Sequence, residues 1–100
     1  MGANAEHIKI TATSDKQFHK KYAAYCEEQC YQYGNDSYAG HLGIKSGRPQ
    51  DISYKFKGKS LRGKAYYEAC ELIDENSDKW DAPAYIKVGR QYVVGGWCAS

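Results

Sequence analysis

The sequence predicts a single α+β domain with a mainly antiparallel sheet and two helices on one face, in the order β-α-β-β-α-β-β. Three observations support this fold class. A chain of 100 residues has room for one hydrophobic core. Two segments repeat apolar residues with the period of a helix, and shorter segments alternate apolar and polar residues. Each helical segment has one apolar face, so we expect both helices to cover the same side of the sheet.

The N-terminal end contains the first predicted strand. Residues 7–13 alternate, with Ile8 and Ile10 on one face, which is typical of a half-buried strand. The six residues before it show no such pattern. We therefore expect residues 1–6 to be a flexible N-terminus and residues 7–100 to form the domain.

The first helix is predicted from its two ends. Ser14 and Gln17 have the spacing of a capping box, which satisfies backbone N–H groups at a helix start. Gly34 suits the end of the helix, because glycine readily adopts the left-handed conformation found there. The apolar face of this helix consists of Phe18, Tyr22, Tyr25, Cys26 and Tyr33, with Cys30 at its edge.

Two alternating segments then predict a β-hairpin. Residues 38–45 place Leu42 and Ile44 on one face, and residues 52–57 alternate apolar residues with serine and lysine. Between them, residues 46–49 contain the glycine and proline of a turn.

The second helix is expected to begin between Ser60 and Lys64 and to end near Asn76. Its buried face consists of Leu61, Ala65, Ala69, Leu72 and Ile73, with Cys70 at the edge. These positions follow the helical period, so the segment should pack one side against the sheet.

The chain ends in two predicted strands, residues 84–88 and 91–97, joined by a tight turn at residues 89–90. The faces of the last strand are Tyr92, Val94 and Gly96 on one side and Val93, Gly95 and Trp97 on the other. Because both faces are apolar, this strand either is central in the sheet or has one face covered by something else.

Composition limits the class of protein. Hydrophobic residues make up 42% of the chain and charged residues 26%, as in an ordinary globular domain. No apolar segment reaches the roughly 18–20 residues of a membrane helix, so no membrane partner is expected. No secretion signal is visible, so we expect a cytoplasmic protein whose four cysteines are reduced thiols.

A metal site is an alternative hypothesis for the cysteines. Cys26 and Cys30 are four residues apart on one side of the first helix, and His19 lies on the same stripe. Zinc would need a further ligand, for which the candidates are Cys70, Cys98 and His41. The chain has no C-x-x-C pair, and small cysteines also suit the margin of a buried helix face. We therefore predict no cofactor and keep a structural zinc site as an alternative.

No motif predicts an enzyme. The run Gly58-Lys59-Ser60 resembles the end of a phosphate-binding loop, but Ser53 replaces the glycine that this pattern requires five residues before Gly58. Cysteine and histidine could form a catalytic pair, yet none of them stands in a recognisable catalytic signature.

Half of the 14 basic residues are close together in the sequence: Lys45, Arg48, Lys55, Lys57, Lys59, Arg62 and Lys64. Only Asp51 opposes them in that segment. Such a cluster could contact a nucleic-acid backbone, which is the second functional hypothesis. Lysines on an edge strand also serve to discourage aggregation, which would explain them without a ligand.

Three segments resemble short, mostly uncharacterised proteins of phages and mobile elements. They are SYAGHLG at residues 37–43, DKWDAPA at residues 78–84 and VVGGWC at residues 93–98. This resemblance implies a small accessory protein, such as an inhibitor of a host defence complex. It implies no catalytic residues.

The leading hypothesis is a non-enzymatic protein that binds a host or other partner protein. Tyrosine supplies 10 residues of the chain, and tyrosine and tryptophan are enriched in protein interfaces. The expected contact residues are Tyr85, Tyr92, Trp97 and Trp80. Self-association into a homodimer is compatible with this hypothesis.

Overall fold

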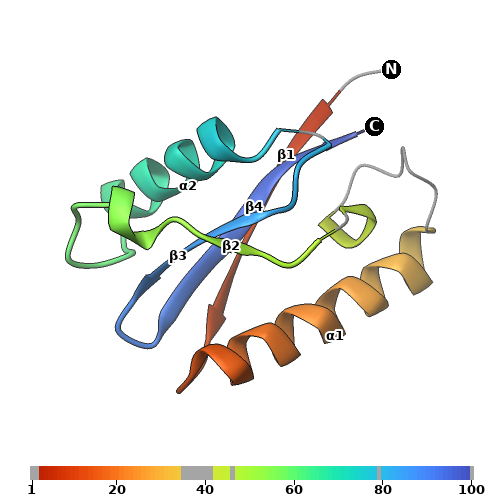
Figure 1. The fold of residues 1–100 in the computed structure, drawn as a ribbon, viewed down its shortest axis with the longest axis horizontal. Helices are drawn as coiled ribbons and strands as arrows, with labels where there is room; N and C mark the ends of the chain where they lie inside the picture. Colours follow the sequence, from red (N-terminus) through yellow and green to blue (C-terminus); the bar gives the residue numbers. More distant parts are fainter. Residues whose placement is uncertain (1–2, 35–41, 46, 79, 100) are drawn as a thin grey trace.

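The structure is a computed structural model that describes residues 3–34, 42–45, 47–78 and 80–99. Its elements are β1 (Ala3–Thr11), α1 (Asp15–Tyr33), η1 (Leu42–Ile44), β2 (Gln50–Asp51), η2 (Ser53–Lys55), α2 (Lys64–Asn76), β3 (Ala84–Val88) and β4 (Gln91–Ala99), where η denotes a 3₁₀ helix (Figure 1). The predicted α+β domain with two helices and a mostly antiparallel sheet is confirmed. The predicted order is wrong, because the described chain runs β-α-β-α-β-β.

The sheet has the strand order β1-β4-β3-β2. Strand β4 is antiparallel to both β1 and β3, and β2 runs parallel to β3 through a two-residue pairing. The apolar C-terminal segment is therefore the central strand, which accounts for its two apolar faces.

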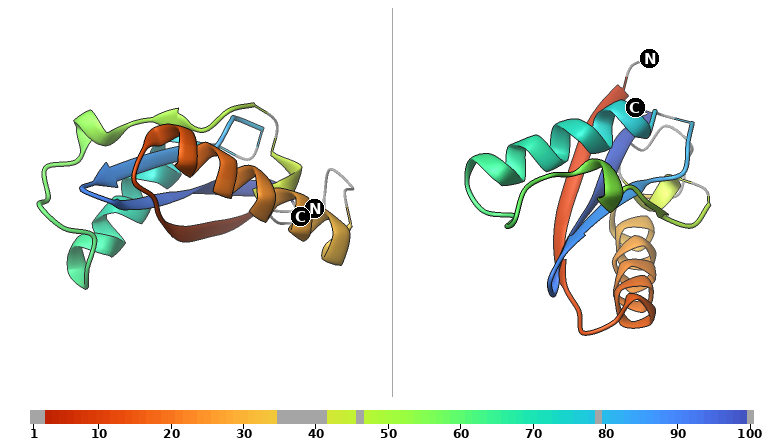
Figure 2. Two further views of the ribbon diagram at one scale, coloured as in Figure 1. Left: turned by 90° about the horizontal axis from the view of Figure 1, so that it is seen from below. Right: turned by 60° about the vertical axis from the view of Figure 1, so that its left-hand side comes forward.

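The helices cover opposite faces of this sheet, so the prediction that both lie on one face is wrong (Figure 2). Alternate residues of β4 point to different helices: Val94 packs in the cluster of Phe18 on α1, and Val93 packs in the cluster of Ile73 on α2. A single apolar face on each helix does not say which side of the sheet it covers. A central strand that is apolar on both sides needs a cover on each.

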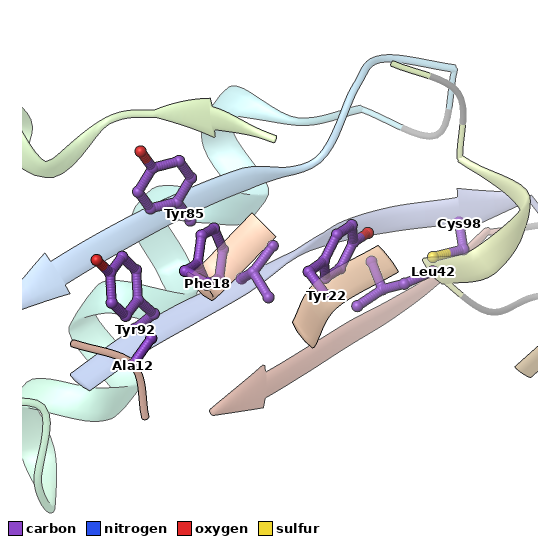
Figure 3. Packing of buried hydrophobic residues seen from close by; sticks show 8 residues of the cluster. Ala12, Phe18, Tyr22, Leu42, Tyr85, Tyr92 and Cys98 are labelled. Atoms are coloured by element: carbon purple, nitrogen blue, oxygen red, sulfur yellow. The ribbon is translucent and has the colours of Figure 1, made fainter. Parts of the chain in front are cut away.

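Two buried clusters follow from this layering. We call the α1 side the aromatic face, and its cluster consists of Ala12, Phe18, Tyr22, Leu42, Tyr85, Tyr92, Val94 and Cys98 (Figure 3). We call the α2 side the aliphatic face, and its cluster consists of Ile52, Leu61, Ala69, Cys70, Ile73, Ala84, Ile86 and Val93.

Both helices lie where the sequence predicts them. The Ser14 side chain accepts a hydrogen bond from the Gln17 backbone N–H at 3.2 Å, and the Gln17 side chain accepts one from the Thr13 N–H. Gly34 ends α1 with a φ of 92°, a left-handed value that suits glycine. Neither α1 nor α2 within the described residues is long and apolar enough to cross a membrane.

The predicted hairpin is not found among the described residues. Its first segment includes residues 38–41, which lie outside the described residues, and Leu42–Ile44 is a 3₁₀ helix. The second segment turns at η2, where the Asp51 carboxylate accepts a hydrogen bond from the Ser53 N–H at 2.9 Å. An aspartate that bonds the backbone two residues on initiates a turn. The alternation of residues 52–57 therefore does not mark a half-buried strand. Tyr54, one of its apolar positions, has a side chain that is 79% exposed.

Strand β1 begins at Ala3, four residues earlier than predicted. Residues 3–6 belong to the segment expected to be flexible, yet they pair with residues 96–99 of β4. The composition of residues 3–6 does not predict a strand. Their pairing depends on the neighbouring strand β4 rather than on their own hydrophobicity.

The glycine pair of β4 allows close packing. A Cβ on Gly95 would lie 2.2 Å from the Glu6 carbonyl oxygen and 2.9 Å from the His7 ring. A Cβ on Gly96, whose φ is 147°, would lie 2.2 Å from the Ser77 hydroxyl oxygen. Neither position has room for a side chain.

Candidate functional site

Two of the predicted protein-contact residues are in the core. The rings of Tyr92 and Phe18 stack with centroids 4.3 Å apart, and Tyr85 packs 4.7 Å from the same Phe18 ring (Figure 3). The Tyr92 side chain is 0% exposed and the Tyr85 side chain is 4% exposed. Their aromatic surface is thus used inside the domain, and they take no part in the surface proposed below.

The other two predicted contact residues remain accessible. Trp80 is exposed, and Trp97 is half-buried at the end of β4, opposite Ala5 of β1. Strand β1 is an edge of the sheet, and its register with β4 is unbroken from Ala3 to Thr11. Trp97 and the edge strand therefore lie side by side, whereas the sequence alone could not bring them together.

The seven basic residues do not form one strip. Lys45 is half-buried and donates hydrogen bonds to the carbonyl oxygens of Asp78 and Trp97. Burial lowers the pKa of Lys45. The Lys55 ammonium donates to the Asn76 side chain, so it lies over the end of α2. Arg48, Lys57 and Lys64 are exposed on different segments.

Lys59 and Arg62 instead meet Lys9 of β1. These three residues line a cavity of about 470 Å³ beside Gly89 and Gln91. No acidic residue is among the described residues that line it. Lys9 was absent from the predicted set because it is distant in the sequence, and only the fold brings it here.

The cysteines give the zinc hypothesis no support within the described residues. No group of three histidine, cysteine or acidic side chains among them could hold a metal ion. The Cys30 thiol donates to the Gly43 carbonyl oxygen at 3.4 Å, and Cys26 is half-buried on α1. Burial raises the pKa of Cys26, and it raises the pKa of Cys98 to about 11, so both stay protonated near neutral pH. His41 lies outside the described residues.

One charged group was not foreseen. His7 Nε2 lies 2.7 Å from Asp74 Oδ1, joining β1 to α2, and the Cys70 thiol neighbours the same imidazole. Burial lowers the pKa of His7, but the interactions with Cys70 and Asp74 outweigh burial and raise it to about 9. A protonated imidazole cannot act as a general base, and Cys70 is buried. The group links α2 to strand β1 on the aliphatic face.

A cleft on the other side of the molecule was also missed. It lies between α1 and the segment that ends at Pro49, and its lining includes His19, Tyr22, Cys26 and Arg48. The spacing of His19, Tyr22 and Cys26 puts them on one side of a helix, which was visible in the sequence. Nothing in the sequence indicated that Arg48 would lie opposite them.

No protein-family model, curated protein or solved structure matched this chain, and the resemblance to short phage proteins stays a prediction.

Proposed function

We propose that this chain is a non-catalytic binding protein whose open edge strand β1 pairs with an extended segment of a partner protein. The observation that carries the proposal is the form of β1. It is an edge strand of nine residues with an unbroken register and no proline. Proteins protect such edges with bulges, prolines or charges, because an open edge pairs readily with another strand. Of these protections, β1 has only the charges of Glu6, His7 and Lys9.

The charges on β1 favour a different protein over a second copy of the chain. An antiparallel pairing of two β1 strands centred on Glu6 would place Glu6 opposite its own copy. A pairing centred on His7 would place two protonated imidazoles opposite each other. A pairing centred on Ile8 would place His7 of each copy opposite Lys9 of the other. Like charges directly opposite one another destabilise a sheet. A partner strand with an acidic residue facing His7 and Lys9 has no such conflict.

Trp97 supplies a side chain that a partner could anchor on. It is on β4, directly across from the small side chain of Ala5, and is half-buried. Backbone pairing gives affinity in this type of recognition, and side chains near the edge give specificity. A partner in a host defence complex would agree with the resemblance to phage proteins.

The test combines affinity capture with hydrogen exchange. A partner is first captured from a host extract with the immobilised protein, identified and purified. We expect it to slow exchange at the β1 amides, and we expect Trp97→Ala to weaken binding about tenfold or more. Tyr31→Ala is the matched control, because Tyr31 is 91% exposed on α1, away from the edge.

Two results would reject this proposal. One is protection confined to α1 or to the turn between β3 and β4. The other is a dimer in light scattering whose β1 amides are protected without any partner. A thermal melt of Trp97→Ala shows whether the variant is folded, and only a folded variant is used for the affinity measurement.

A second candidate function is contact with a nucleic-acid backbone at the cavity between Lys9, Lys59 and Arg62. Three cations favour it, since the described residues of the lining include no acidic side chain. Phosphate contacts release counterions, so affinity should fall steeply as salt is raised. The double variant Lys59→Glu with Arg62→Glu should abolish binding of a short duplex, and Lys57→Glu should change it little. Salt-independent binding would exclude this function.

A further inference from the structure

The cleft between α1 and the segment ending at Pro49 has the size of a small-molecule site. Its volume is about 400 Å³, and small-molecule sites span roughly 300–1,000 Å³. Tyr22 and Pro49 give it apolar surface, and His19, Lys45 and Arg48 give it polar groups. Lys45 in its lining donates to the Trp97 carbonyl oxygen, but the cleft lies on the α1 side and its test below does not involve the β1 edge.

Two residues that line this cleft each have a buried polar atom without a partner among the described residues. Among the described residues, His19 Nδ1 and Tyr22 Oη are the buried side-chain nitrogen and oxygen atoms that make no hydrogen bond. Both residues line the same cleft, and Tyr22 is only 6% exposed. Burial raises the pKa of Tyr22, and the neighbouring Cys26 thiol raises it further, but no hydrogen bond of good geometry joins the two side chains. Both unpartnered atoms are buried, so they lie behind the surface of the cleft, and the ligand is inferred from the charged groups that line it.

The charge of the cleft indicates what that ligand is. Arg48 is exposed and makes no hydrogen bond or ion pair with the described residues, and its forked guanidinium suits an oxyanion. The Lys45 ammonium has three donors and uses two of them on carbonyl oxygens. No acidic side chain is among the described residues that line the cleft.

We propose that this cleft binds a small organic anion, with one carboxylate or phosphate group held by Arg48 and Lys45. The remaining atoms of the ligand lie against Pro49 and the Tyr22 ring. His19 supplies a neutral polar contact, because burial and the nearby Arg48 lower its pKa. The thiol of Cys26 is protonated and acts as lining rather than as a nucleophile.

The experiment is an NMR titration of the ¹⁵N-labelled protein with benzoate, with phenyl phosphate and with uncharged benzyl alcohol. We expect saturable shifts at residues 19–26 and 45–49 with at least one of the anions, at least tenfold tighter than with the alcohol. Tighter benzoate identifies a carboxylate ligand, and tighter phenyl phosphate identifies a phosphate ligand. Absence of saturation with both anions up to about 10 mM, or equal binding of the alcohol, overturns the proposal.

Two matched variants test the contribution of Arg48. Arg48→Gln should weaken the better anion about tenfold, whereas Arg62→Gln, an equally exposed arginine elsewhere, should leave its affinity unchanged. If Arg48→Gln binds like the natural protein, the proposal is wrong.

Discussion

The aromatic face and the aliphatic face solve the same packing problem with different residues. On the aliphatic face, α2 covers the sheet with alanine, isoleucine and leucine, and the nearby charges of His7 and Asp74 satisfy each other. On the aromatic face, α1 covers the sheet with Phe18 and Tyr22, which meet the rings of β3 and β4. Among the described residues, the two buried side-chain nitrogen and oxygen atoms without a partner, His19 Nδ1 and Tyr22 Oη, are thus both on the aromatic face.

The difference comes from what each residue type brings into the core. An aliphatic side chain brings no polar atom, so a face built from it needs only to be filled. Each tyrosine brings a hydroxyl that needs a partner. Tyr25 finds the Glu6 carboxylate at 3.0 Å, and Tyr92 finds the Asp15 carboxylate at 2.6 Å. Tyr22 finds none among the described residues, so the aromatic face keeps one buried hydroxyl without a partner.

The largest expected effect is the loss of a core residue from either face. Phe18→Ala should lower the free energy of unfolding by about 4 kcal/mol, because it removes a fully buried ring that stacks on Tyr92. Ile73→Ala, the counterpart on the aliphatic face, should cost about 3 kcal/mol. Urea unfolding followed by circular dichroism measures both, with Tyr31→Ala as an exposed control. A larger loss for Ile73→Ala would make the aliphatic face the main core.

The sequence predicts those parts of the fold that depend on local signals. The Ser14 cap and the Gly34 end of α1 are read from neighbouring residues, and both are found. The hairpin prediction fails because a side-chain contact outweighs the alternation of apolar and polar residues. The Asp51 carboxylate accepts a hydrogen bond from the Ser53 N–H and starts a turn there. The placement of α2 also fails, since the choice of sheet face depends on strand order, which no local pattern contains.

The candidate sites were less predictable than the fold. Tyrosine in a sequence is equally suited to a core and to a surface, and the register of the sheet decided that Tyr85 and Tyr92 are buried. His19 and Tyr22 were on a predicted helix face, but their cleft exists only because Arg48 and Pro49 fold back over α1. Contacts between residues far apart in the chain were the part that could not be foreseen.

A second prediction concerns pH and the aliphatic face. The pKa of His7 is about 9 in the folded protein and about 6.5 in the unfolded chain. The stabilisation from the His7–Asp74 pair is therefore complete below pH 6.5 and is lost as the pH rises through 9. We expect the free energy of unfolding to fall by about 2 kcal/mol between these pH values, within the limit of about 1.4 kcal/mol per pH unit for one proton.

The comparison variant for this prediction is Asp74→Asn. It removes the partner charge, so the loss of stability between pH 6.5 and 9 should become smaller than in the natural protein. Urea unfolding at several pH values measures the slope. An equal slope in Asp74→Asn would assign the pH dependence to groups other than the His7 pair.

The smallest expected effect comes from making the same chemical change, tyrosine to phenylalanine, at two positions of the aromatic face. Because the change is identical, the two positions can be compared directly. Tyr92→Phe removes a hydroxyl that donates to Asp15 and should cost about 1 kcal/mol of unfolding free energy. Tyr22→Phe removes a buried hydroxyl that has no partner, so it should cost nothing or stabilise the protein slightly. Urea unfolding measures both losses of free energy. The comparison is valid when the slope of the unfolding free energy against urea concentration is the same in the variants and in the natural protein. If Tyr22→Phe costs as much as Tyr92→Phe, the Tyr22 hydroxyl has a structural partner, and the polar atoms of the aromatic face are as well paired as those of the aliphatic face.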